Sequence, residues 1–233
     1  MHLSKRLNTI ASICQPATVL ADVGCDHAYL SIHLVTAGIV DSAIAMDLRE
    51  GPLKKAAENV KAYGLENRIS LRLGNGLEKL EKNEADLVLI SGMGGILICD
   101  ILTRGWDKIC ETGQLVLQPQ SDLQLVRHFL HDRGMVIDEE KMCIDDGKYY
   151  TCIHASFGTV EKYKHEYEYE FGKLLIDNKD KILAEYLCER LYKNKAIISS
   201  MEAGGRTEED DTLKSFLQYY AVMSEIYADI SGK

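Results

Sequence analysis

The fold of this chain is decided by one stretch, Thr18-Val-Leu-Ala-Asp22-Val-Gly24-Cys25-Asp26-His27-Ala28-Tyr29-Leu30. It begins with an apolar run, passes through a lone glycine and a polar pair, and continues with apolar residues at helical spacing. This order predicts a strand, a tight turn and a helix. In an open parallel sheet, such a turn lies at the carboxyl end of the first strand, where ligands bind.

The segments that surround this turn alternate between helical and strand-like patterns. An amphipathic helix is predicted over 3–14, and apolar strand-like runs recur at 42–46, 68–73, 85–90 and 113–117. Two further strands, at 135–143 and 149–157, flank an Asp-Asp-Gly turn, and this spacing suits an antiparallel hairpin. We therefore expect an α/β fold with a doubly wound, mostly parallel sheet and an antiparallel edge.

The character of the chain changes at about Gly158, where Glu, Lys and Tyr become frequent. Apolar residues then recur at helical spacing in two runs, 174–191 and 213–230, which are separated by a Gly-Gly break. This pattern is typical of an antiparallel helical hairpin of coiled-coil type. We expect two domains, 1–157 and 158–233.

The composition limits the class of protein. No apolar run in the 233 residues approaches the roughly 20 that a membrane helix needs, and the first residues do not resemble a signal peptide. The seven cysteines are scattered and form no C-x-x-C, which favours a reducing cytoplasm and argues against a disulfide framework or a cysteine-based zinc site. With a formal net charge of −9, a nucleic-acid partner would need a local basic face.

The first turn does not suit a dinucleotide. The fingerprint for that ligand requires three glycines, whereas this turn has only Gly24, and Asp26 would repel a pyrophosphate. S-adenosylmethionine fits better, because Asp22 or Asp26 can meet its cationic end and backbone N–H groups its carboxylate. The alternative is that Asp26 and His27 merely cap the following helix.

Polar or glycine-rich turns also follow the next three strands. Asp47 ends the second strand, where a carboxylate accepts ribose hydroxyls, and Asn75 follows the third, where its amide can pair with adenine. Ser91-Gly92-Met93-Gly94-Gly95 ends the fourth, and its glycines would let the backbone approach a flat ring. Each of these turns has a plain structural alternative, but their order at four successive strand ends favours a nucleoside-containing cofactor.

That order resembles the class I S-adenosylmethionine-dependent methyltransferases. A nearer resemblance is carried by Asp22-x-Gly-x-Asp-His-Ala-Tyr-Leu30 and Gly92-Met-Gly-Gly95, with support from Ser4-Lys-Arg-Leu7, Glu50-Gly51-Pro52, Asn75-Gly76-Leu77, Leu115-x-Leu-Gln-Pro119 and Gly147-Lys-Tyr-Tyr150. These strings are similar to the bacterial tRNA (adenine-N1)-methyltransferase family that acts on adenine 22. The match covers about residues 2–155, and the later hairpin resembles the family's C-terminal coiled coil.

The resemblance implies a Rossmann-like methyltransferase domain, S-adenosylmethionine as the cofactor, and methyl transfer to N1 of adenine in the D-arm region of tRNA. Family members often have Pro at the position of Ser31, Ser or Thr at Cys25, and Ala at Ser91, so the contacts of these three residues are open. We expect cofactor contacts from Asp22, Gly24, Cys25, Asp26, Asp47, Asn75, Gly76, Ser91, Gly92 and Met93.

The candidates for catalysis and for tRNA binding follow from the same family resemblance and from the charges of the side chains. Asp26 is the first candidate for stabilising a cationic product ring, with Asp22 as the second, and the resemblance places His27, Tyr29 and Gln118 near the acceptor base. Basic or polar contacts to tRNA are expected from Lys5, Arg6, Gln118 and Arg127.

Two other functions remain compatible with the sequence. The net charge of −9 suits a class I methyltransferase for a small molecule or protein, in which the hairpin would serve dimerisation or partner binding. A non-catalytic nucleotide-binding adaptor, whose hairpin does the work, is the second. The sequence makes no prediction of oligomeric state.

Overall fold

A computed structural model describes residues 2–109 and 113–232, so Cys110 of the cysteine pattern lies outside the described residues. The chain separates into two compact units, Met1–Lys162 and Tyr163–Lys233. The division into domains at 1–157 and 158–233 remains a prediction.

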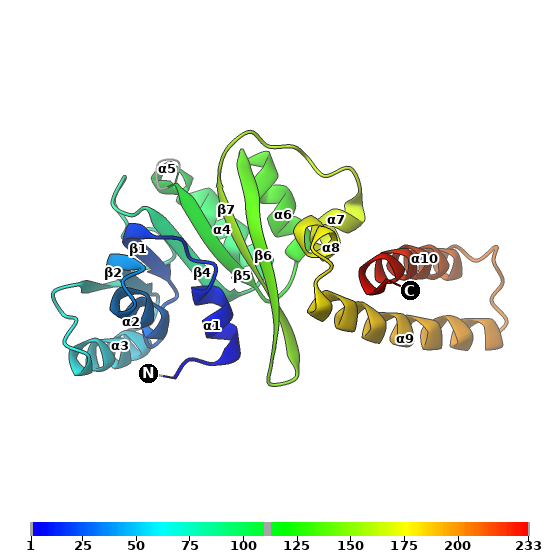
Figure 1. The fold of residues 1–233 in the computed structure, drawn as a ribbon, viewed down its shortest axis with the longest axis horizontal. Helices are drawn as coiled ribbons and strands as arrows, with labels where there is room; N and C mark the ends of the chain where they lie inside the picture. The colour runs from blue at the N-terminus through cyan, green and yellow to red at the C-terminus, as the bar shows by residue number, and fades with distance from the viewer. Residues whose placement is uncertain (1, 110–112, 233) are drawn as a thin grey trace. The chain divides into compact units, whose positions relative to one another are not determined.

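The first unit is built on one seven-stranded sheet with the order β3-β2-β1-β4-β5-β7-β6 (Figure 1). Its strands are β1 (Ala17–Val23), β2 (Val40–Asp47), β3 (Ile69–Leu73), β4 (Leu87–Met93), β5 (Gln114–Pro119), β6 (Met135–Asp145) and β7 (Lys148–Phe157). The first five strands pair with one another in parallel, whereas β7 is antiparallel to β5 and β6 is antiparallel to β7. The doubly wound sheet with an antiparallel edge is therefore confirmed. The strand order reverses between β1 and β4, which is where a ligand crevice forms in such folds.

Helices connect the strands of this sheet. They are α1 (Lys5–Ala11), α2 (Tyr29–Thr36), α3 (Glu50–Ala62), α4 (Gly95–Arg104), α5 (Trp106–Ile109) and α6 (Leu123–Asp132). Buried side chains of α1, α2 and α3 join those of β1, β2 and β4 in one hydrophobic cluster. The central strands are buried throughout their apolar runs, which explains why they read as continuous rather than alternating patterns.

Most element bounds differ from the expected ones by a few residues, and two differences matter here, one at a strand end and one in an additional helix. The strand expected to end at Ile90 continues to Met93, because Ser91 pairs with Gln118 and Met93 with Pro119 across a register shift. The short helix α5 was not expected, since a four-residue turn carries too little periodicity to be read from sequence.

The second unit consists of helices alone in the part that is described. These are α7 (Glu166–Phe171), α8 (Lys173–Asp177), α9 (Lys181–Ala203) and α10 (Asp211–Ser231), and the last two pack against each other as the expected hairpin. The apolar pattern from 174 onward is interrupted at Lys179, whose φ is 52°, and Asp180 then caps α9 by accepting from two backbone N–H groups. None of the helices in residues 2–109 and 113–232 combines the length and apolar character needed to cross a membrane.

Candidate functional site

A cavity of about 510 Å³ opens where the carboxyl ends of β1, β2, β3 and β4 meet. Its volume is in the usual range for a small-molecule site. The structure brings every predicted cofactor residue to its lining: Asp22, Gly24, Cys25, Asp26, Asp47, Asn75, Gly76, Ser91, Gly92 and Met93. His27, Tyr29 and Arg6 line the same cavity.

The backbone of the first turn is fixed by positive φ angles and by contact with two neighbouring strands. Gly24, Asp26 and Ala28 have φ values of 71°, 51° and 58°, and the N–H groups of Gly24 and Cys25 both donate to the carbonyl of Met46. A Cβ atom at Gly24 would clash with the terminal methyl of Met93, so glycine allows the turn and the end of β4 to approach closely.

The helix-cap alternative for the polar pair is not supported. Helix α2 begins at Tyr29 with Ala28 as its N-cap residue, and no side chain caps it. Asp26 and His27 are therefore available for contacts other than the helix end.

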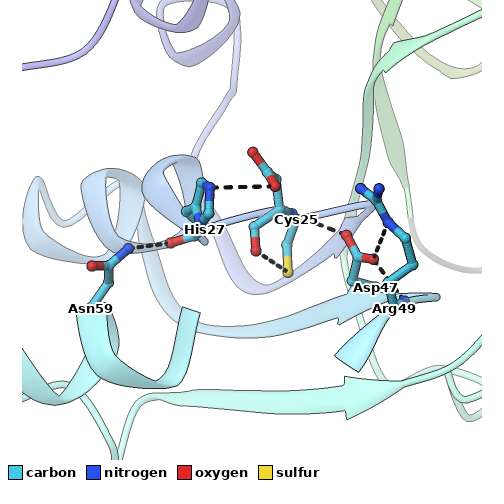
Figure 2. Close-up of polar contacts among 6 residues, drawn as sticks. Cys25, His27, Asp47, Arg49 and Asn59 are labelled. Carbon is cyan, nitrogen blue, oxygen red and sulfur yellow. Dashed lines mark hydrogen bonds and ion pairs between the residues drawn. The ribbon is translucent and has the colours of Figure 1, made fainter. Parts of the chain in front are cut away.

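Asp47 connects the end of β2 to the first turn, as Figure 2 shows. Its carboxylate is buried and accepts the backbone N–H of Arg49 at 2.9 Å and that of Asp26 at 3.3 Å. The Arg49 side chain lies 3.9 Å away. Each carboxylate oxygen keeps a further acceptor site. Asp47 therefore has the chemistry to bind a pair of hydroxyl groups while it holds the turn in place.

Asp22 is the buried acid of the cavity. Its side chain accepts a hydrogen bond from the Ser31 hydroxyl at 2.6 Å, which gives a structural role to the residue that stands where the family often has Pro. Burial raises the pKa of the Asp22 carboxyl to about 6, the hydrogen bonds from Ser31 oppose this rise, and the charge of Asp47 adds to it. A cation placed beside Asp22 would lower that pKa, so the site favours a positively charged ligand group.

Asp26 and His27 lie at the more accessible part of the cavity. The Asp26 side chain is 62% exposed, and its Oδ1 lies 3.6 Å from Nε2 of His27. The His27 carbonyl accepts from the Asn59 amide at 2.9 Å (Figure 2), and the ring centroid lies 5.7 Å from that of Tyr29. The His27 Nδ1 is buried and has no hydrogen-bond partner among the described residues. This edge therefore offers the Asp26 carboxylate to a second ligand, beside the partly exposed ring of His27.

The four residues expected to contact tRNA lie in different environments. Lys5 is exposed on α1, and Arg6 lines the cavity. Gln118 is completely buried, with its side chain bonded to Arg6, so the predicted contact of Gln118 with tRNA is wrong. Arg127 corrects the prediction, because it is 1% exposed and its Nε donates to the buried Glu140 at 2.8 Å. Its guanidinium cannot reach a phosphate, so Arg127 is a core residue.

Several lining residues were missed by the sequence analysis. Arg49, Leu97, Ile101 and Gln120 also line the cavity. Gln120 follows the end of β5, so the signal that identified the other strand ends could have found it. Ile101 lies in the middle of α4 and carries no such signal. No group of three or more His, Cys, Asp or Glu residues suited to a metal occurs in the described part of the chain.

Comparison with known proteins places this geometry in context. A family model described as a methyltransferase domain matches residues 3–153. The tRNA (adenine(22)-N(1))-methyltransferase of Bacillus subtilis (strain 168) is 32% identical over 231 residues, which cover 97% of each chain.

Solved structures agree with the sequence matches. The crystal structure of the B. subtilis m1A22 tRNA methyltransferase TrmK superposes with a TM-score of 0.82 at 30% identity and covers 98% of both chains. A Streptococcus pneumoniae structure in complex with S-adenosyl-L-methionine gives a TM-score of 0.84 at 32% identity, over 97% of this chain and 100% of that one. With matches that run from end to end and strand-end residues gathered around one cavity, the chain belongs to the tRNA (adenine(22)-N1)-methyltransferase family.

Proposed function

We propose that the protein transfers a methyl group from S-adenosylmethionine to N1 of adenine 22 in tRNA. The observation that carries this proposal is the cavity itself. It gathers the acid, amide and glycine residues of four strand ends, in a chain that is 32% identical to a tRNA (adenine(22)-N(1))-methyltransferase over nearly its whole length.

The residues of the cavity fit the cofactor in charge, hydrogen bonding and shape. Asp47 would accept the ribose hydroxyls, Asn75 would pair with adenine, and the raised pKa of Asp22 marks a buried acid that a cationic group would stabilise. Because Gly24 has no Cβ atom, the terminal methyl of Met93 can lie against the first turn. When bound, the cofactor supplies an electrophilic methyl group on a positively charged sulfur.

The acceptor needs little help from a base. N1 of adenine has a lone pair in the ring plane and no proton, so positioning and electrostatics account for most of the work of the protein. Methylation makes the ring cationic, and a carboxylate near its exocyclic amino group would favour the transition state. Asp26 is our first candidate because its side chain is exposed to the cavity, whereas Asp22 is buried and bonded to Ser31.

His27 and Tyr29 would orient the acceptor ring. The partly exposed His27 ring can pack against the base, and the Tyr29 ring lies beside it. Because N1 is hidden in a Watson–Crick pair, the base must be unpaired or turned out of its stack.

Lys5, exposed on α1, is a candidate phosphate contact. A tRNA substrate also implies a cytoplasmic location.

The proposal is tested by incubating unmodified tRNA transcript with the protein and S-adenosylmethionine, followed by mass spectrometry of the nucleosides. We expect one 1-methyladenosine per transcript and none when adenine 22 is replaced by guanine. Transfer of labelled methyl to protein or small molecules instead would support the first alternative function. Absence of S-adenosylmethionine binding by titration calorimetry would support the adaptor.

A further inference from the structure

Arg6 is held in the cavity by segments that are far apart in the sequence. Its backbone N–H donates to Oδ2 of Asp145 at 3.1 Å, which ties α1 to the end of β6. The centre of its guanidinium lies 5.6 Å from the centroid of the Tyr150 ring, on β7. A Cβ atom at Gly92 would lie 3.6 Å from Nη1 of Arg6, so the guanidinium also lies close to the end of β4.

Gln118 orients the guanidinium without neutralising it. The Nε2 of this buried amide donates to the carbonyl of Pro119 at 3.0 Å, so Oε1 is the atom that accepts from Nη1 of Arg6, at 2.9 Å. Chemistry requires this orientation, because a backbone carbonyl cannot donate and a guanidinium cannot accept. Arg6 is therefore directed by a neutral partner and keeps its full charge.

The charges of the cavity are separated by strand. The carboxylates of Asp22, Asp26 and Asp47 belong to the ends of β1 and β2 or to the turn between them, whereas Arg6 lies against the ends of β4 and β5. Arg49 also lines the cavity but lies beside Asp47, while Arg6 makes no ion pair within residues 2–109 and 113–232. One oriented cation is thus left to bind an anion.

We propose that Arg6 is the oxyanion-binding residue of this cavity and that its remaining N–H groups hold a carboxylate or phosphate of a bound ligand. A guanidinium has five N–H donors in a planar fork that matches both oxyanions. The inference rests on the proposed function, because that reaction brings both groups here. They are the carboxylate at the amino-acid end of the cofactor and the phosphate of the target nucleotide.

Arg6 binds and positions the ligand and does not stabilise the developing charge of the base. A guanidinium beside a ring that becomes cationic would raise the energy of the transition state. This role also differs from the surface contact that the sequence suggested, because the side chain lies within the cavity and is bonded to a buried amide.

The test compares Arg6→Met with Lys61→Met, which removes the same charge from an exposed position on α3. Dissociation constants are measured by calorimetry for S-adenosylhomocysteine, which has the carboxylate, and for 5′-deoxy-5′-methylthioadenosine, which lacks it. The dissociation constant and KM for tRNA are measured in parallel, and thermal melting reports whether each variant is folded.

We expect Arg6→Met to weaken one oxyanion ligand by roughly 10- to 100-fold, the usual effect of losing hydrogen bonds to a charged group. Weaker binding of S-adenosylhomocysteine with unchanged methylthioadenosine identifies the carboxylate. A raised KM for tRNA with both small ligands unchanged identifies the phosphate. In either case Arg6→Lys should recover part of the loss, and Lys61→Met should change each value less than about twofold.

Two results would overturn the proposal. One is an equal loss of affinity for both small ligands, which would mean that the cavity is distorted, and the other is no change for any ligand. If the wild-type protein transfers no methyl group to tRNA, the proposed function fails, while the comparison of the two small ligands still decides whether Arg6 binds a carboxylate.

Discussion

Asp22 makes the properties of the protein depend on pH between about 4 and 6. Its pKa is 3.8 in an ordinary setting and about 6 in the folded protein, because burial disfavours the charged form. In that window the folded state binds more protons than the unfolded state, so the free energy of unfolding falls as pH rises. The loss is on the order of 2–3 kcal/mol and is complete above about pH 6.

Thermal melting of the protein without cofactor, between pH 4 and 7, measures this effect. We expect Asp22→Asn to remove the part of the pH dependence that belongs to this window. Cofactor affinity should change in the opposite direction and rise with pH toward 6, because a cationic ligand binds the ionised carboxylate. An affinity that is constant across this range would contradict the assignment of Asp22 to the cationic end.

Asp26→Asn tests the assignment of the carboxylate that assists methyl transfer. The change keeps the size of the side chain and removes its charge, so we expect a fall in single-turnover rate of about 10- to 100-fold. Affinity for S-adenosylhomocysteine should fall less than the rate, since the side chain is 62% exposed. A rate equal to that of the wild type would eliminate Asp26.

Gly24 and Gly38 form a matched pair for separating the cost of backbone strain from an effect on the cavity. Both have φ near 70°, but a Cβ atom at Gly24 would clash with Met93, whereas a Cβ atom at Gly38 meets nothing within 4 Å. We expect each substitution to cost about 1 kcal/mol of unfolding free energy, because the terminal methyl of Met93 can move aside, and only Gly24→Ala to weaken cofactor binding, because Gly24 lines the cavity. Urea unfolding and calorimetry measure the two effects, and unchanged cofactor affinity in Gly24→Ala would contradict this expectation.

At the level of secondary structure, the Arg127–Glu140 pair fastens α6 to β6. Both side chains are almost completely buried, and the Arg127 Nε donates to Oε1 of Glu140 at 2.8 Å. Arg127→Met would leave a buried carboxylate without its partner and should cost roughly 3–5 kcal/mol in urea unfolding. Arg127→Met combined with Glu140→Leu should recover much of that loss. If the double variant is folded but binds tRNA much more weakly than the wild type, Arg127 would have to be a tRNA contact after all.

The elements that were predictable are those with a strong local pattern. The buried strand β4 follows from a continuous apolar run, although it extends to Met93, and the helical character of α9 follows from the apolar spacing over 174–191. That extension depends on pairing with β5, and pairing across about 25 residues of intervening chain leaves no local pattern. The break at Lys179 was missed for a related reason, since the apolar spacing continues across it.

For the molecule as a whole, the gathering of the strand-end residues in one cavity was predictable because parallel strands end at the same edge of a sheet. Knowing that a residue follows a strand was enough to assign Asp47 and Asn75 to one cavity. The partner of Arg6 was not predictable, since Gln118 is 112 positions away. Arg127 was misassigned because a basic residue on an amphipathic helix usually faces water, and its buried acid belongs to another element.

The net charge of −9 leads to a prediction about salt. If tRNA is held by a small number of basic contacts on an acidic protein, its affinity should fall steeply as NaCl rises from 50 to 200 mM, by about tenfold or more. Binding of S-adenosylhomocysteine should change little, because its charged groups would be shielded within the cavity. Filter binding and calorimetry in the same buffers compare the two. Equal salt dependence would contradict separate binding modes.

The carboxylate of Asp47 has a consequence for the rate of ligand entry. It accepts the amide of Asp26, and Met46 accepts those of Gly24 and Cys25, so the chain itself supplies the bonds that hold the first turn. A binding site whose first turn is held in this way is preorganised, so ligand binding requires little ordering of that turn. The rate of cofactor exchange between successive tRNAs would then be set by diffusion and by desolvation of the cavity.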